Sequence, residues 1–169
     1  MVIEGNRVRI IPISEEDTDD IIYWRNNVRD KFIYRDLFTR ESHTKWLNSM
    51  VKTGKVAQFV IQIKEGRKIG SVFLRDIDYH HKKAEYGIFI GDTEAQGHGY
   101  GTEAAKLILE YGFKELGLHK IMLRVLATNE RAVRSYEKVG FRQEGYFKDD
   151  VFVDGKFEDV IFMAILKSE

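Results

Sequence analysis

Apolar and polar positions alternate in the middle of the chain and predict three neighbouring strands. These strands cover residues 57–64, 68–80 and 84–90, and short turns near residues 65–67 and 80–83 separate them. Alternation with a period of two places successive side chains on opposite faces of a sheet. Because the connections are short, we expect an antiparallel meander.

One strand and two helices are predicted before the meander. The strand covers residues 7–13, and the helices cover residues 14–27 and 39–54. Ser14 is a favourable first residue for a helix, and acidic residues follow it. Gly54 is a typical residue at a helix end. The first third of the chain is therefore expected to contribute one strand and two helices.

After residue 100 the pattern changes to helix, strand, helix and hairpin. We expect these elements over residues 101–117, 119–128, 129–140 and 141–166. Asp154-Gly155 is a pair that favours a type I′ hairpin turn. The whole order predicts an α/β (α+β) fold with a mixed, mostly antiparallel central sheet and helices on both faces. We interpret residues 1–169 as a single domain.

Composition narrows the function classes. Lysine plus arginine and aspartate plus glutamate both number 27, so the formal net charge is zero. Nucleic-acid binders usually have a basic excess, and we expect no nucleic-acid partner. No apolar run approaches the roughly 18 residues of a membrane helix, and the first residues lack a signal-peptide pattern. We expect a cytoplasmic location and no membrane contact. The sequence has no cysteine, which excludes thiolate nucleophiles and zinc–thiolate sites.

A glycine-rich stretch lies where the helix after residue 100 must begin. Gly97, Gly99 and Gly101 alternate with other residues. Such a loop at a helix start is typical of an anion site, because backbone N–H groups converge there. A Walker loop would need lysine directly after Gly101, and a dinucleotide fingerprint that begins at Gly97 would need its third glycine at position 102. Thr102 stands at this position, so neither pattern fits. The remaining pattern is Q-x-x-G-x-G, beginning at Gln96; the alternative is an ordinary glycine-rich turn.

A second motif lies 30 residues further on and has the form N-x-x-A-x-x-x-Y-x-K-x-G-F. Its members are Asn129, Ala132, Tyr136, Lys138, Gly140 and Phe141. The two motifs and the strand at 84–90, in this order and spacing, resemble the GNAT superfamily of acetyl-CoA-dependent N-acetyltransferases. The resemblance is good over residues 58–166 and weaker in the first third.

The resemblance implies the GNAT fold and acetyl-CoA as co-substrate, with no metal. Acetyl-CoA is expected where two parallel strands, 84–90 and 120–127, diverge. Three parts of the chain are then expected to bind it: the strand at 84–90, the glycine-rich loop and the helix at 129–140. The residues are Ile88, Phe89, Ile90, Gln96, Gly97, His98, Gly99, Tyr100, Gly101, Thr102, Asn129, Ala132 and Tyr136. His98 replaces the lysine or arginine often found in this loop, so Arg131 or Arg134 is a candidate source of positive charge.

The reaction needs a neutral amine, although alkyl amines titrate near pH ~10, and a proton donor for the leaving thiolate. By resemblance, Tyr136 is the general acid and Glu85 is a candidate base acting through water. Tyr86, His80 and His81 are alternatives for the base. A packing role remains open for Tyr136, and an N-cap role remains open for Asn129.

The acceptor is less well defined. The chain looks most like ribosomal-protein N-terminal acetyltransferases and bacterial spermidine N-acetyltransferases. Its first third also resembles enzymes that act on nucleotide-linked amino sugars. Trp24, Arg25 and Tyr86 are expected to contact the acceptor, with packing as the alternative for both tryptophans, Trp24 and Trp46.

We expect direct transfer to a protein N-terminus, a polyamine or another small amine, in a ternary complex. A non-catalytic coenzyme A sensor and a general phosphate or nucleotide binder are the alternatives from other classes. A homodimer is a further expectation from the relatives. An acidic acceptor pocket would indicate a polyamine, and a basic pocket would indicate a nucleotide sugar.

Overall fold

The computed structural model describes residues 1–31, 33 and 36–168, and its frame is a mixed β-sheet. Eight strands in this part of the chain follow the order β1-β2-β3-β4-β5-β6-β8-β7. All neighbouring strands are antiparallel except β5 and β6, which are parallel. The predicted fold class, a mixed and mostly antiparallel sheet, is confirmed.

The strands agree closely with the alternating pattern. They are β1 (Ile3–Glu4), β2 (Val8–Pro12), β3 (Ala57–Ile63), β4 (Lys68–Asp78), β5 (Lys83–Ile90), β6 (Lys120–Leu126), β7 (Arg142–Val153) and β8 (Lys156–Leu166). β3, β4 and β5 form the expected meander. Asp154 and Gly155 both have positive φ, at 49° and 83°, as a type I′ turn requires. The short β1 was not expected.

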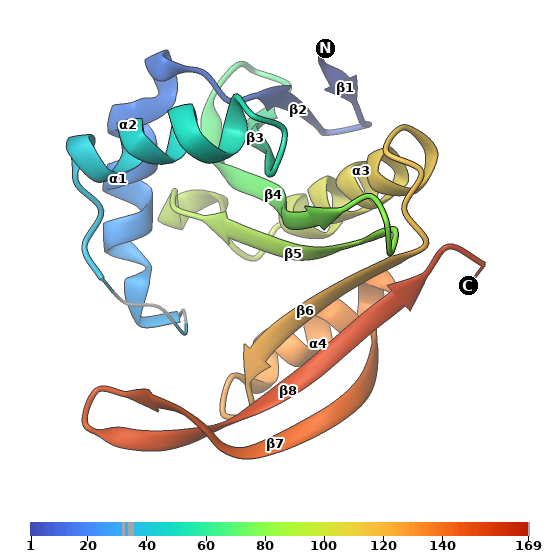
Figure 1. Cartoon of the computed structure of the whole chain (residues 1–169). Coiled ribbons are helices and arrows are strands. Elements are labelled where there is room, and N and C mark those ends of the chain that lie inside the picture. Colours follow the sequence, from blue (N-terminus) through green and yellow to red (C-terminus); the bar gives the residue numbers. More distant parts are fainter. Residues whose placement is uncertain (32, 34–35, 169) are drawn as a thin grey trace.

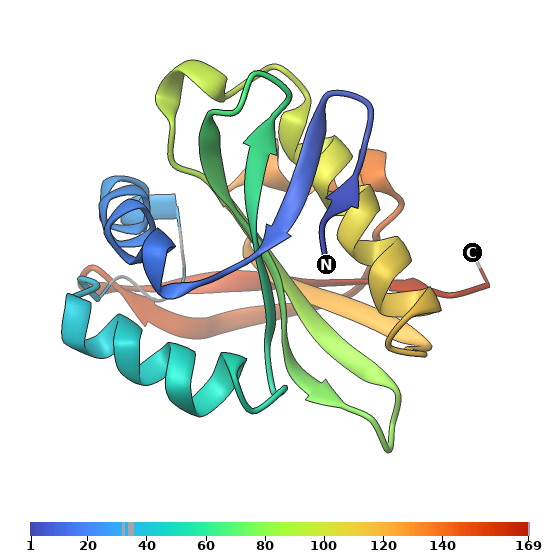
Figure 2. The same ribbon diagram turned by 90° about the horizontal axis from the view of Figure 1, so that it is seen from above.

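Helices cover both faces of the sheet (Figures 1 and 2). α1 (Thr18–Asn27) and α2 (Arg40–Trp46) lie on one face, and α3 (Tyr100–Lys114) and α4 (Glu130–Val139) lie on the other. The first predicted helix begins with a 3₁₀ turn at Glu15–Asp17, and the second ends in a π-helical turn at Leu47–Val51. The prediction was therefore right about the helices and imprecise about their ends.

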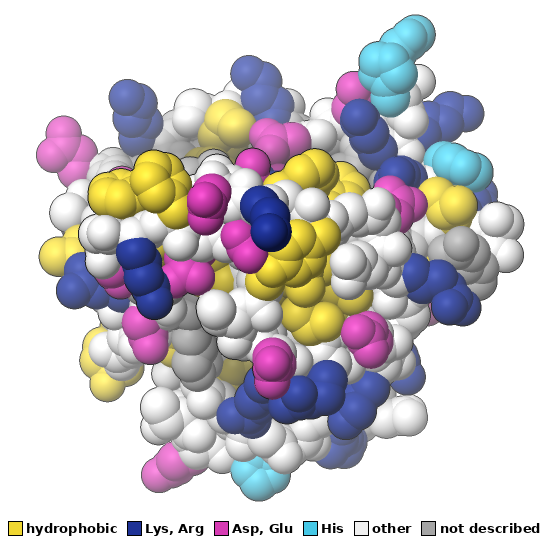
Figure 3. Space-filling view, turned by 90° about the horizontal axis from the view of Figure 1, so that it is seen from below, with side chains coloured by type: hydrophobic (Ala, Val, Ile, Leu, Met, Phe, Trp, Pro, Cys, Tyr) yellow, Lys and Arg dark blue, Asp and Glu magenta, His cyan; other side chains and the backbone are white. Residues whose placement is uncertain are grey.

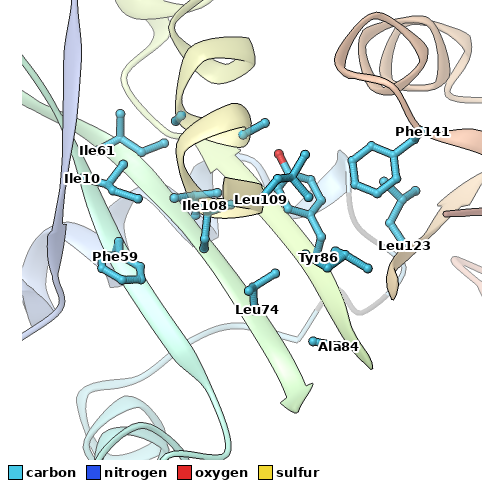
Figure 4. Close-up of a cluster of buried hydrophobic side chains, with 14 of the residues drawn as sticks. Ile10, Phe59, Ile61, Leu74, Ala84, Tyr86, Ile108, Leu109, Leu123 and Phe141 are labelled. Carbon is cyan, nitrogen blue, oxygen red and sulfur yellow. The ribbon is translucent and has the colours of Figure 1, made fainter. Parts of the chain in front are cut away.

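Two apolar clusters hold the helices to the sheet. Under α3, Leu74, Ile108 and Ile61 have no exposed surface, and Figure 4 shows them together in this cluster. Under α1, Val60 and Phe89 pack against α1 residues. Full burial of such a side chain stabilises a fold by about 1.5–3 kcal/mol, so these clusters fix the faces that each strand presents. The two clusters therefore hold the helices in fixed positions against the strands.

β5 and β6 separate soon after they meet. Their ladder has only the pairs Lys83↔Lys120, Ala84↔Ile121 and Glu85↔Met122. β5 continues to Ile90 and β6 to Leu126 without pairing to each other, and the two strands diverge in Figure 1. The expected divergence of two parallel strands is confirmed. It leaves polar backbone groups of both strands facing the opening between them.

Candidate active site

A cleft of about 930 Å³ lies in the opening between β5 and β6. Its size is at the upper end of the roughly 300–1,000 Å³ that is usual for ligand pockets. Most residues that the sequence singled out line it. They are Arg25, Glu85, Tyr86, Ile88, Phe89, Ile90, Gln96, Gly97, Gly99, Tyr100, Gly101, Thr102, Asn129, Ala132 and Tyr136.

Two predicted site residues lie outside this lining. Trp24 is 6% exposed and packs against Gly91 in the apolar cluster under α1, so it supports the site from behind. The His98 ring lies 3.0 Å from the carbonyl oxygen of Glu94, which turns it away from the cleft. His80 and His81, the alternative bases, are exposed in the turn between β4 and β5.

The glycine-rich loop has the shape of an anion site. Gly97 and Gly99 have φ of 79° and 81°, a left-handed conformation that side chains disfavour. Gly101 differs, because a Cβ there would find its nearest neighbour at 3.6 Å. The Gln96 Nε2 donates to the Ile90 carbonyl at 2.8 Å and fixes the loop to the end of β5. Backbone N–H groups at the start of α3 can therefore bind a phosphate.

Two arginines lie near the loop, in which His98 replaces the usual cation. Arg131 lines the cleft, whereas Arg7 lies outside the lining and its Nε is 3.2 Å from Glu103 Oε2. The Arg131 Nη2 lies 3.8 Å from the Cβ position of Gly97. The Arg7 Nη2 lies 2.9 Å from the Cβ position of Gly99, and Arg7 Nη1 donates to the His98 carbonyl at 2.8 Å. Arg134, the other candidate, lies outside the lining and is 3.9 Å from Glu130. Arg7 could not be predicted from the sequence motifs, because it precedes His98 by 91 positions.

Tyr136 lies on α4 with its ring against Tyr86 and Phe141, at centroid distances of 6.0 and 6.1 Å. Burial raises the pKa of Tyr136 to about 12, so the hydroxyl keeps its proton at neutral pH. The Asn129 Oδ1 accepts from the Ala132 N–H at 3.3 Å. Asn129 therefore caps α4, and this cap fixes the start of the helix that carries Tyr136.

Glu85 lies at the vertex of the opening and is 7% exposed. Its Oε1 accepts from Arg75 Nη2 at 3.1 Å and from Arg124 Nε at 3.0 Å. The carboxylate is thus the counterion of two guanidinium groups from the strands on either side. A proton on Glu85 would disrupt both ion pairs. Its role as a base stays a prediction.

The opposite wall comes from α2 and from strands β3 and β4, and most of its residues were not predicted from the sequence. Trp46, for which packing was the alternative role, lines the cleft, and its Nε1 donates to Gln58 Oε1 at 3.0 Å. His43 also lines the cleft and is 2% exposed. Burial lowers the pKa of His43 and so favours a neutral imidazole, while the negative charge of Asp17 acts in the opposite direction. Phe38 and Phe73 complete an aromatic surface.

Metal sites and membrane-spanning helices were also sought in the part of the chain that the structure describes. Within residues 1–31, 33 and 36–168, no three His, Asp or Glu side chains gather closely enough to hold a metal ion. Over the same residues, every helix is too short or too polar to cross a bilayer.

The divided sheet, the anion-binding loop and the protonated Tyr136 define a transferase that holds a phosphate-bearing co-substrate between two strands. Comparison with known proteins identifies the family. Residues 7–142 match the Acetyltransferase (GNAT) domain, and the chain belongs to this family. It is an acetyl-CoA-dependent N-acetyltransferase with the GNAT fold, as the two motifs indicated.

The chain is similar to members of both groups expected from its motifs. Spermidine N(1)-acetyltransferase of Escherichia coli (strain K12) is 31% identical over 168 residues, which are 99% of this chain and 84% of the relative. The putative ribosomal N-acetyltransferase YdaF of Bacillus subtilis (strain 168) is 31% identical over 105 residues, which are 62% of this chain and 57% of the relative.

Solved structures of spermidine N-acetyltransferase from Vibrio cholerae have the same fold. The complex with CoA and spermine gives a TM-score of 0.88 at 30% identity and covers 97% of this chain and 98% of that one. A dodecameric form gives a TM-score of 0.84 at 28% identity and covers 97% and 96%. These matches favour neither the nucleotide-sugar alternative nor the sensor alternative.

Proposed function

We propose that this enzyme acetylates the primary amine of a small molecule by direct attack on acetyl-CoA in a ternary complex, with Tyr136 as general acid. One observation carries this proposal: Tyr136 on α4 and the Gly97–Gly99 loop before α3 line the same cleft. The loop suits the phosphates of the co-substrate, and the tyrosine is a proton donor within the same enclosure.

The residues divide the work between binding and proton transfer. Gly97 and Gly99 present backbone amides to the pyrophosphate, with Arg131 and Arg7 as neighbouring cations. The edge of β5 that faces away from β4, after Glu85, offers backbone N–H and C=O groups to the amide-containing arm of coenzyme A. The amine nitrogen forms a bond to the acetyl carbon, the carbon–sulfur bond breaks, and the Tyr136 hydroxyl donates a hydrogen bond to the departing thiolate. The proton lost by the amine passes to water or to a base in the cleft.

Polyamines are the first acceptor class to test, because the relative that aligns over 99% of this chain and both solved structures just described are spermidine N-acetyltransferases. The experiment is to follow free thiol release from acetyl-CoA with a panel of amines, including spermidine and a peptide with a free N-terminus. We expect amine-dependent release well above hydrolysis for at least one class. Absence of release with every class would contradict the proposal.

The alternative of a non-catalytic coenzyme A sensor predicts a different result for the same protein. A non-catalytic sensor would be stabilised by coenzyme A without releasing thiol from acetyl-CoA. The presence of both Asn129 and Tyr136 in the cleft supports turnover instead. Stabilisation by ATP or NAD in place of coenzyme A would indicate a general nucleotide binder.

We also propose that the chain self-associates, a homodimer being the smallest form, through the outer face of β7 and β8. Figure 3 views this side and shows hydrophobic side chains among charges of both signs. The exposed aromatic residues of the two strands are Tyr146, Phe147, Phe152 and Phe157. Light scattering should show a smaller species for Phe152→Ser but not for Tyr23→Ser on α1.

The cytoplasmic location stays a prediction.

A further inference from the structure

His43 is a buried histidine in the wall of the cleft. It lies on α2, lines the cleft and is 2% exposed. Neither ring nitrogen of His43 has a hydrogen-bond partner among the residues that the structure describes. A buried polar atom without a partner costs about 1–3 kcal/mol, and such atoms are rare in folded proteins. The imidazole therefore has a free lone pair that the fold itself does not use.

The ring meets the site from the α2 side. Trp46 follows His43 by three positions, so the two side chains lie on the same face of the helix, and both line the cleft. Tyr136 on α4 and the Gly97–Gly99 loop before α3 line the same cleft. The imidazole and the groups that suit the co-substrate therefore border one space, which can hold an acceptor amine.

The charges around His43 leave its imidazole neutral. Burial lowers its pKa below the usual 6.5, and Asp17, on the 3₁₀ turn before α1, acts in the opposite direction. The Asp17 carboxylate is already paired with Lys68 of β4 at 2.6 Å. Arg25 of α1 and Arg75 of β4, the charged residues that these two elements contribute to the described lining, add no negative charge. Above pH 6.5 the ring is therefore unprotonated and can accept a proton.

The carboxylates and the buried tyrosines of the described lining suit this role less. Glu85 is the counterion of two arginines, one from β4 and one from β6. Tyr86 and Tyr136 have raised pKa values, so both keep their protons at neutral pH. Asp30 is exposed to solvent. His43 differs from all four, because it combines burial in the cleft wall with a neutral, unpartnered ring.

We propose that His43 is the general base of the transfer, and that one of its ring nitrogens takes a proton from the acceptor ammonium, directly or through one water. This inference rests on the proposed function and names the proton acceptor of the same site. The freed lone pair of the amine forms the bond to the acetyl carbon, and the carbon–sulfur bond breaks. A second proton lost by the amine nitrogen neutralises the departing thiolate, and the imidazolium returns the first proton to water. A neutral imidazole adds no positive charge to the acceptor site, so this role suits a polyamine.

The pH dependence of the chemical step tests the role. Thiol release is followed in single turnovers at saturating amine, with spermidine first, so that product release does not limit the rate. Alkyl amines titrate near pH ~10, so we compare rates from about pH 7 to about pH 9.5. The wild-type rate should change little over this range. His43→Gln should be roughly 100- to 1,000-fold slower near pH ~7, and its rate should rise about tenfold per pH unit, because only the free amine then reacts.

Two further variants control the comparison. His119→Gln changes an exposed histidine outside the cleft lining and should keep the wild-type rate at every pH. His43→Asn is a second substitution at the site and should behave like His43→Gln. Circular dichroism melts check that each variant folds, and calorimetry checks that it still binds coenzyme A. A deficit of equal size at every pH would indicate a structural role and contradict the inference.

Failure of this inference can be distinguished from failure of the proposed function. Full activity in folded His43→Gln would contradict the role of His43 and leave the transferase function intact. A wild-type rate that rises about tenfold per pH unit would also overturn the inference, even if no variant at this position folded. Absence of thiol release from the wild type with every amine would contradict the proposed function, and the role of His43 would fail with it.

Discussion

Replacing Tyr136 by phenylalanine removes one hydroxyl group from the cleft and leaves the ring. The ring keeps its contacts with Tyr86 and Phe141, so we expect the protein to remain folded with little change in stability. The pKa of about 12 means that about one molecule in 100,000 has an ionised Tyr136 at pH 7. Wild-type Tyr136 is therefore a proton donor at every working pH.

The size of the effect follows from the donor and the leaving group. Thiols titrate near pH ~8.5, so complete proton transfer from a hydroxyl of pKa about 12 is unfavourable by roughly 3.5 pKa units. Tyr136 then stabilises the developing thiolate mainly by a hydrogen bond to a charged atom, which is worth about 1.5–3 kcal/mol. This corresponds to a loss in kcat of roughly 10- to 100-fold in Tyr136→Phe.

The assay is thiol release at saturating acetyl-CoA and amine, with coenzyme A affinity measured separately by calorimetry. We expect kcat to fall and the coenzyme A dissociation constant to stay nearly unchanged. Tyr111→Phe is the matched control, because it removes a hydroxyl from α3 outside the cleft lining. An unchanged kcat in Tyr136→Phe, or equal losses in both variants, would refute the assignment.

Three further measurements follow from the site. Gly97→Ala should weaken coenzyme A binding because its φ is positive, whereas Gly101→Ala should be tolerated because a Cβ there has room; calorimetry compares them. Burial, reinforced by Tyr136, raises the pKa of Tyr86 above 10, so the folded state holds the proton more tightly. The contribution of Tyr86 to stability should then be constant below pH 10 and fall above it by about 1.4 kcal/mol per pH unit. Tyr136, whose pKa is also raised, adds a similar loss up to a pH of about 12; urea unfolding measures the sum, and no alkaline loss would contradict this. The lowered pKa of His43 works in the opposite direction, so stability should fall below pH 6.5, and His43→Leu should reduce that acid dependence.

Much of the frame could be predicted from the sequence because local signals there agree with the tertiary structure. Residues of β3 and β4 alternate strongly and are joined by short turns, so only one pairing satisfies the pattern. Asp154-Gly155 specifies its turn through backbone conformation alone. The loop at Gly97–Gly101 and the helix that carries Tyr136 were found because each motif is contiguous.

The acceptor wall could not be predicted, because it depends on which distant elements meet. Charged residues such as Arg75 and Arg124 within strands usually indicate a solvated face, yet here they are drawn inward around Glu85. His43 reads as an ordinary helix residue until α2 packs over the sheet. Trp24 illustrates the converse: its neighbours along the chain suggested a contact with the acceptor, but its side chain packs against Gly91 outside the cleft lining.

The short ladder between β5 and β6 divides the sheet into two plates whose backbone pairing is confined to one corner, while the apolar cluster under α3 packs across both. Strands β1 to β5 form one plate and β6, β8 and β7 form the other, with three residue pairs between them. A co-substrate bound along the free edges would complete the seam, so part of its binding free energy would appear as resistance to unfolding. Hydrogen exchange in β5 and β6 should then slow when coenzyme A is present, and an enzyme starved of its co-substrate would open first at this seam.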